Sequence, residues 1–252
     1  MRWKATIAYN GAHYCGWQVQ PNGLSVQEVV ENALAKIVKS PVGAVSSGRT
    51  DAGVHAKGQV FHFDCDLNMT GEQWRLALNS LLPDDMIIRK VEEADPNFHS
   101  RFDALWKRYD YVINMGEYDP FMKDLEFEYN KRLDVRAMRT AAGYLVGTHD
   151  FTSFNANSLE ERPNQTRTIY EITISEHRGK VTISYAGNGF LRYMVRMMTG
   201  ILIEVGKKKI RPEKVRKLME KKSKTAVNYN AVPNGLYLME VGYSEYVQKL
   251  QE

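Results

Sequence analysis

A succession of strand and helix signals occurs twice along this chain, and this repetition constrains the fold more than any other feature. Residues 2–9 place apolar side chains at every second position, which predicts a half-buried strand. A helix is expected after Ser25, because Ser25 and Glu28 have capping-box spacing and apolar residues then recur at helical spacing until Pro41. The remaining elements of the first half are expected as strands at residues 44–47, 58–64 and 86–92 and a helix from Thr70 to Ser80. The order of the first half is therefore β-α-β-β-α-β.

The second half repeats this order of elements without evident sequence identity to the first. We expect strands at residues 105–114, 169–175, 181–185 and 236–243, a helix from Asp134 to Val146, a long helix from about Phe190 to Val205 and a short basic helix after Pro212. This order predicts an α+β fold of two split β-α-β halves, ferredoxin-like or RRM-like. No low-complexity linker separates residues 1–104 from 105–252, so we expect the halves to join in one mainly antiparallel sheet with a central cleft.

The composition is that of a globular protein. Of 252 residues, 43% are hydrophobic and 25% are charged. Two cysteines cannot form a disulfide framework, the first residues lack an apolar run of signal-peptide length, and no stretch approaches about 18 consecutive apolar residues. We therefore expect a cytoplasmic protein that does not enter a membrane. The formal net charge is only +4, so any surface for nucleic acid must come from local clusters of basic residues.

Asp51 lies in a glycine-rich loop between two expected strands, within the run SSGRTDAGVHAKGQVFHFD at residues 46–64. Gly48 and Gly53 bracket it and allow the backbone to turn sharply. A carboxylate beside the guanidinium of Arg49 stays ionised and oriented, which suits a nucleophile or a group that stabilises positive charge. The alternative is an ordinary hairpin turn with an Asp–Arg pair at the surface, because turns collect Asp and Gly.

Two segments of the second half offer aromatic and cationic side chains. Along the strand at 106–111, Tyr109 and Tyr111 share a face, and they either stack on a base or belong to the core. Phe190 and Arg196 lie in the run GNGFLRYMVR, where Phe190 is expected on one face of a helix and an arginine is ordinarily solvated.

The loop sequence GRTDAGVHA closely resembles the signature of the anticodon-stem-loop tRNA pseudouridine synthases, the TruA family. Other segments resemble the family in the same order along nearly the whole chain, namely AYNGAHYCGWQVQ, SVQE, NFHSRF, KRYDY, DFTSF, NGFLRYMVR and GLYL. The resemblance implies a pseudouridine synthase fold, a homodimer and a tRNA substrate. It also implies isomerisation of uridine to pseudouridine at tRNA positions 38, 39 and 40.

The family's motifs imply roles for residues in both halves. By resemblance, Tyr109 contacts the target base and Phe190 lines its pocket. Arg196 pairs with the catalytic aspartate, Asp51, and Leu236 in GLYL lies against the base. The reaction breaks the N1–C1′ bond and rejoins uracil through C5, so no cofactor is needed. Asp51 either adds to C1′ or abstracts the 2′ hydrogen, and the sequence leaves both routes open.

Basic side chains offer contacts to RNA. Arg49 either replaces or grips an extruded nucleotide, or it stabilises the turn. The strongest basic cluster is either a solvated face or a phosphate contact and comprises Lys207, Lys208, Lys209, Arg211, Lys214, Arg216, Lys217, Lys221, Lys222 and Lys224. The histidines lack the spacing of metal ligands, so no metal is expected. The segment before Leu236, KSKTAVNYNAVPN, has fewer small residues than the family pattern, which puts that edge of the pocket in question.

Two other classes of protein fit parts of this pattern. A non-catalytic RNA-binding module can use the same sheets, with Tyr109 and Tyr111 as stacking residues, but it does not need Asp51. A hydrolase can use Asp51 on the glycosidic bond and would release free uracil. Isomerisation of uridine by the purified protein distinguishes a synthase from both the RNA-binding module and the hydrolase.

Overall fold

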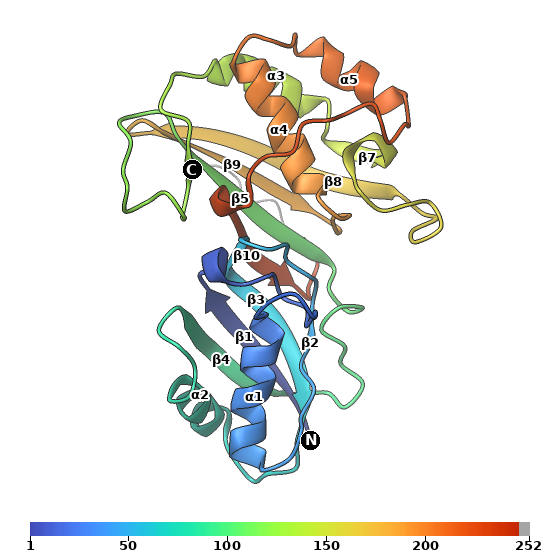
Figure 1. The fold of residues 1–252 in the computed structure, drawn as a ribbon. Coiled ribbons are helices and arrows are strands. Elements are labelled where there is room, and N and C mark those ends of the chain that lie inside the picture. The colour runs from blue at the N-terminus through green and yellow to red at the C-terminus, as the bar shows by residue number, and fades with distance from the viewer. Residues whose placement is uncertain (247–252) are drawn as a thin grey trace. The chain divides into compact units, whose positions relative to one another are not determined.

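The computed structural model describes residues 1–246, and the chain divides into two compact units. Unit 1 comprises Met1–Leu105 and Tyr237–Ser244, and unit 2 comprises Trp106–Leu236 and, among the described residues, 245–246. The chain therefore leaves unit 1 after Leu105 and returns to it at Tyr237, as the colours of Figure 1 show. The last strand was expected with the second half by chain order, whereas its contacts group all but its first residue with unit 1.

In unit 1 the strands follow the order β4-β1-β3-β10, and β2 pairs with β3. β1 pairs antiparallel with β3 and with β4, whereas β10 runs parallel to β3. The elements are β1 (Arg2–Tyr9), α1 (Val26–Val38), β2 (Val45–Ser46), β3 (His55–Asp64), α2 (Gly71–Asn79), β4 (Met86–Ala94) and β10 (Leu236–Gly242), with the 3₁₀ turn η1 (Gly11–His13) after β1.

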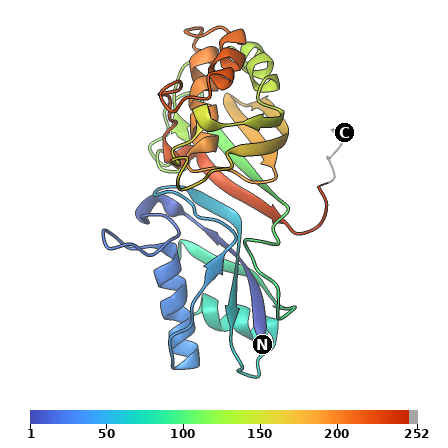
Figure 2. The same ribbon diagram turned by 90° about the vertical axis from the view of Figure 1, so that its right-hand side faces the viewer.

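The helices of unit 1 begin where the sequence signals them. The Ser25 side chain accepts the Glu28 N–H at the start of α1, and Thr70 and Gln73 form a complete capping box at the start of α2. α1 and α2 contact each other and cover one face of the sheet (Figures 1 and 2). Beneath α2, the Trp74 ring lies edge-on to Phe63, with ring centroids 5.1 Å apart. This core fixes β3, the strand that follows the Asp51 loop.

In unit 2 the strands follow the order β5-β9-β8-β7, with antiparallel pairing throughout this order. Its helices lie over one face of the sheet in Figure 1. The elements are β5 (Trp106–Asn114), β6 (Phe127–Glu128), α3 (Val135–Gly143), β7 (Gly147–Asp150), η2 (Thr152–Phe154), β8 (Thr166–His177), β9 (Lys180–Gly187), α4 (Met194–Gly206), α5 (Glu213–Glu220) and η3 (Pro233–Gly235).

The predicted α+β class and mainly antiparallel pairing are confirmed, with two differences in detail. The long helix was expected from about Phe190, but α4 begins only at Met194. Tyr193 has φ 61°, a left-handed conformation that a right-handed helix cannot contain, so Phe190 lies in the turn before the helix. The short strands β6 and β7 were not predicted.

The core of unit 2 is built around two fully buried tyrosines. Tyr111 donates its hydroxyl hydrogen to the carbonyl of Val232 at 2.9 Å, and Tyr185 is hydrogen-bonded to Thr199 at 2.8 Å. Burial raises the pKa of Tyr111, which keeps its hydroxyl protonated. Tyr111 is thus a core residue and not a free stacking platform. Within residues 1–246, no helix is long and apolar enough to cross a membrane.

Candidate active site

The Asp51 loop ends in a tight turn that leads directly into β3. The N–H of Val54 donates to the carbonyl of Asp51 at 3.1 Å, and Gly53 closes the turn with φ +77°. A residue with a Cβ rarely adopts this conformation, so Gly53 is the glycine that the turn requires. The Asp51 side chain is half-buried, whereas the Arg49 side chain is exposed.

The residues on either side of Asp51 are fixed by the segment after β1. The Thr50 hydroxyl lies 2.8 Å from the hydroxyl of Tyr9, and the Thr50 carbonyl accepts the N–H of Trp17 at 3.2 Å. The N–H of Gly53 donates to the carbonyl of Tyr14 at 3.2 Å. Burial raises the pKa of Tyr9, so its hydroxyl stays protonated as a partner for Thr50. These hydrogen bonds hold the Asp51 backbone from both sides.

Two glycines of the same segment allow it to approach the loop. A Cβ at Gly16 would lie 2.5 Å from the Thr50 carbonyl oxygen, and Gly16 has φ +97°. A Cβ at Gly11 would lie 2.0 Å from the carbonyl oxygen of Val54. Both separations are shorter than van der Waals contact, so only glycine fits without displacing the loop. Both glycines lie in the segment AYNGAHYCGWQVQ, and no local sequence signal predicts their role.

A buried amide holds the other end of the loop. Gln59 on β3 is fully buried, and its Nε2 donates to the carbonyl of Gly48 at 2.8 Å. Its Oε1 accepts the hydroxyl hydrogen of Ser47 at 2.7 Å. A buried amide with both ends satisfied specifies one arrangement, which fixes the chain immediately before Arg49. No local sequence signal identifies Gln59, because its partners lie 11 and 12 residues away along the chain.

His55 joins the loop region to β10. It is 1% exposed, and its Nδ1 accepts the N–H of Gly11 at 3.0 Å. Its ring stacks on Tyr237 with centroids 4.6 Å apart, where β10 runs parallel to β3. The last strand is thereby packed against the end of the Asp51 loop.

Tyr109 lies on β5 in unit 2, opposite Tyr185 of β9. Only 9% of Tyr109 is exposed, and its ring meets Phe190 edge-on with centroids 5.2 Å apart. Of the predicted site residues, Tyr109 and Phe190 are therefore in contact. Their edge-to-face geometry is a favoured aromatic arrangement and orients both rings.

Arg196 lies in the first turn of α4 and is tied to the segment before η3. Its Nε donates to the carbonyl of Ala231 at 2.8 Å, and its own carbonyl accepts the Ala231 N–H at 3.0 Å. Its guanidinium lies over the Tyr193 ring, 4.9 Å from the centroid. Arg196 is therefore a half-buried, oriented cation and not a solvated arginine.

Leu236 is 4% exposed and follows a glycine that packs against the core. A Cβ at Gly235 would lie 2.7 Å from the carbonyl oxygen of Val112 and 3.0 Å from ring carbons of Tyr111. The close approach of Gly235 thus sets where β10 begins. In unit 2, the structure places Tyr109, Phe190, Arg196 and Leu236, whereas Asp51 and Arg49 belong to unit 1.

The histidines include one that is clearly a neutral core residue. His62 is buried, its Nδ1 lies 3.0 Å from the Ser100 hydroxyl, and burial lowers its pKa to about 4. In the part of the chain that the structure describes, no three His, Cys, Asp or Glu side chains are grouped as metal ligands would be.

Comparison with known proteins matches both units. A family model described as tRNA pseudouridine synthase matches residues 5–103 and 141–244, which include Asp51, Phe190, Arg196 and Leu236. Tyr109 lies between the two matched stretches.

Curated relatives extend the match over almost the whole chain. A protein of Exiguobacterium sp. named tRNA pseudouridine synthase A is 43% identical over 244 residues, covering 97% of this chain and 98% of the relative. The Bacillus subtilis protein of the same name is 44% identical over 246 residues, covering 96% and 99%. A Bacillus cereus protein named tRNA pseudouridine synthase A 1 is 41% identical over 245 residues, with the same coverage. The chain belongs to the tRNA pseudouridine synthase family.

Proposed function

We propose that this protein isomerises uridine to pseudouridine in tRNA, at positions 38, 39 and 40 of the anticodon stem-loop. The observation that carries this proposal is the Asp51 loop, which is fixed on both sides by Tyr9, Trp17 and Gln59 in a chain of the tRNA pseudouridine synthase family. A single carboxylate on a rigid loop is the group that this chemistry requires. The reaction takes place in the cytoplasm.

Asp51 acts on the ribose of the target uridine. The N1–C1′ bond breaks, the uracil turns, and C5 bonds to C1′, while the C5 hydrogen leaves as a proton and N1 takes up a proton. The electron pair of the broken bond stays with the uracil and positive character develops on the sugar, as in glycoside cleavage. Asp51 either adds to C1′ or abstracts the 2′ hydrogen, and in both routes an ionised carboxylate stabilises the change without oxidation or an added group.

The residues of unit 2 hold the base, in this proposal. Tyr109 stacks on the uracil, and the edge-on packing of Phe190 supports this role because it orients the tyrosine ring. Phe190 and Leu236 exclude water from the reacting atoms. Arg196 pairs with Asp51 and orients it, a role supported by the anchoring of its Nε on Ala231.

In this proposal, the two units have different roles. Unit 1 carries the catalytic loop, and unit 2 carries the base-holding side chains. Arg49 contacts the extruded nucleotide or its phosphate, because its side chain is exposed beside Asp51.

An unmodified tRNA transcript carrying 5-tritiated uridine tests the proposal. Rejoining through C5 displaces the C5 hydrogen, so tritium release and pseudouridine at positions 38, 39 or 40 are expected together. Release of free uracil would indicate a hydrolase instead. Tight binding without either product would indicate an RNA-binding module.

Gly16→Ala is expected to lower the rate at saturating tRNA by about 10- to 100-fold, because the added methyl group displaces the Thr50–Asp51 backbone and small misplacements of a reacting group are costly. Single-turnover kinetics and a thermal melt measure this effect. Gly43→Ala is the matched control, since a Cβ at Gly43 meets nothing within 4 Å. Equal rates for the two variants would show that the close approach at Gly16 does not position Asp51.

We expect the active unit to be a homodimer that binds one tRNA across both protomers, because a tRNA is large for a single chain of 28.9 kDa. Sedimentation of the free protein should give twice the chain mass, and the specific activity should fall when the protein is diluted until it dissociates. A monomer that is fully active at its working concentration would contradict the dimer.

A further inference from the structure

The most basic run of the sequence is partly neutralised by its own fold. Lys207 pairs with Glu204 at 2.8 Å, and Lys209 lies 3.8 Å from the same carboxylate. Lys208 lies 3.8 Å from Asp134. Three consecutive lysines therefore share two carboxylates. The positive charge that remains available for a partner must be sought further along the chain.

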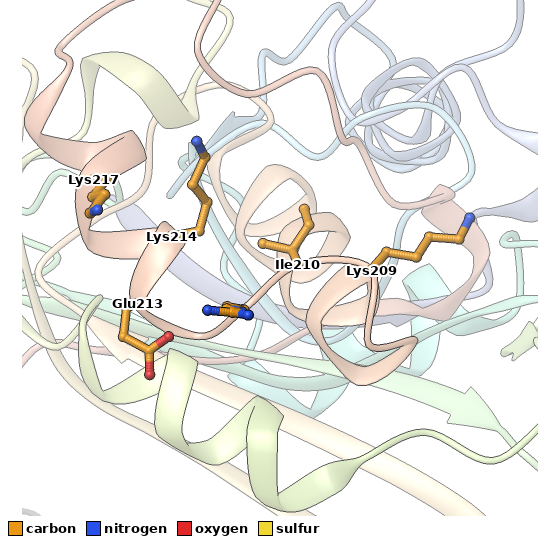
Figure 3. Close-up of a pocket in the computed structure, with 6 residues that line it drawn as sticks. Lys209, Ile210, Glu213, Lys214 and Lys217 are labelled. Atoms are coloured by element: carbon orange, nitrogen blue, oxygen red, sulfur yellow. The ribbon is translucent and has the colours of Figure 1, made fainter.

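A hollow of about 590 Å³ lies directly after this run, where the chain passes from α4 to α5. In Figure 3, Lys214 points upward and Lys209 points to the right, whereas the Glu213 carboxylate points downward. The hollow is lined by four cations, one carboxylate and one apolar side chain, namely Lys209, Arg211, Lys214, Lys217, Glu213 and Ile210. The lining therefore carries a net charge of about +3.

Unlike Lys209, the other three cations of the hollow have no acidic partner among the described residues. Within residues 1–246, no carboxylate lies within 4.0 Å of the charged groups of Arg211, Lys214 or Lys217, and all three side chains are exposed. These three residues differ in this respect from Lys207 and Lys209. Like charges held together repel one another, so such a cluster is favoured by a partner that supplies negative charge.

α5 presents two of these cations, Lys214 and Lys217, on a rigid element. Val215, Leu218 and Met219 are buried and anchor one face of the helix. Lys214 and Lys217 are three residues apart and lie on the opposite, exposed face. The exposed face is therefore fixed in orientation by the buried one, while the lysine side chains keep the freedom to follow a chain of phosphates.

We propose that this hollow, lined by Lys209, Arg211, Lys214 and Lys217, docks the phosphate backbone of tRNA. The proposal rests on the proposed function, which supplies tRNA as the substrate. The lining has exposed cations and no aromatic side chain, so it fits phosphates and not stacked bases. None of the residues proposed for catalysis lines it. The contact is therefore independent of sequence and acts on binding, not on the chemical step.

The test compares two triple variants with the same loss of charge. The first is Arg211→Gln, Lys214→Gln, Lys217→Gln. The control is Arg89→Gln, Lys36→Gln, Lys39→Gln, whose parent side chains are exposed in unit 1. The affinity for unmodified tRNA is measured over a range of salt concentrations, with pseudouridine formation followed in parallel.

The hollow variant should bind tRNA at least about tenfold more weakly than the parent at low salt. The slope of log affinity against log salt should be smaller in magnitude by about 2 to 3. Its KM should rise by a similar factor, while kcat stays near that of the parent. The control should keep the affinity and salt slope of the parent. The single variant Lys214→Glu, at an exposed position, should weaken binding in the same direction if the triple variant folds poorly.

An unchanged affinity and salt slope in the hollow variant would overturn the docking proposal. Equal losses in the control would also overturn it, because the effect would then follow net charge and not this hollow. Pseudouridine formation by the parent reports on the proposed function separately. A parent that binds tRNA through the hollow but forms no pseudouridine would contradict the function and leave the docking site standing.

Discussion

Asp51→Asn is expected to lower pseudouridine formation by about 10⁴-fold or more while leaving tRNA affinity nearly unchanged. The amide has almost the shape of the carboxylate, but it cannot act as a nucleophile or a base. Hydrogen bonds to the backbone of Gly48, Thr50 and Gly53 and to the Thr50 hydroxyl hold the loop without using the Asp51 carboxylate, so they remain in the variant. A large loss of rate therefore reports the chemistry of Asp51 and not a displaced loop.

The measurement is a single-turnover rate at saturating tRNA, together with a binding curve. Asp84→Asn is a suitable control, because Asp84 is an exposed carboxylate outside the loop, and it should keep the rate of the parent. Turnover by Asp51→Asn at more than about a hundredth of the parent rate would remove Asp51 from the catalytic role.

The second large effect is expected at Tyr109. Tyr109→Leu removes the ring that packs against Phe190 and that stacks on the base in our proposal, whereas Tyr109→Phe removes only the hydroxyl. Stacking of a base on an aromatic ring is worth about 1–3 kcal/mol, so the leucine variant should be slower than the phenylalanine variant by about 10- to 100-fold. The difference between parent and Tyr109→Phe measures the hydroxyl's part in proton transfer.

Tyr111→Phe is the matched control for this pair, since Tyr111 lies two residues further along β5 with its hydroxyl bound to Val232. Loss of the Tyr111 hydroxyl should lower the free energy of unfolding by about 1 kcal/mol and leave the rate near that of the parent. If Tyr109→Leu and Tyr109→Phe both react at the parent rate, Tyr109 belongs to the core like Tyr111.

The sequence was sufficient to predict most elements of the fold and the place of Asp51. Alternation and helical spacing located the strands and helices because most of them bury one face, and the capping residues marked two helix starts. The start of α4 was wrong because the left-handed conformation of Tyr193 is imposed by its surroundings and has no glycine to signal it. β7 (Gly147–Asp150) was missed because the strand is short and lacks large apolar side chains.

The supports of the candidate site could not be predicted, because they join residues far apart in the sequence. Tyr9 and Thr50 are 41 residues apart, and Gly11 and His55 are 44 apart. The basic cluster shows the same limit. Lys208 and Lys214 are equivalent in a charge count, and only the structure shows that Asp134, which is 74 residues away along the chain, lies 3.8 Å from Lys208.

The pseudouridine content of tRNA from cells that lack this protein tests the central claim most directly. The proposal predicts that pseudouridine disappears at positions 38, 39 and 40, returns when the parent protein is restored, and stays absent when only Asp51→Asn is supplied. Pseudouridine that persists at these positions without the protein, or that Asp51→Asn restores, would contradict the account.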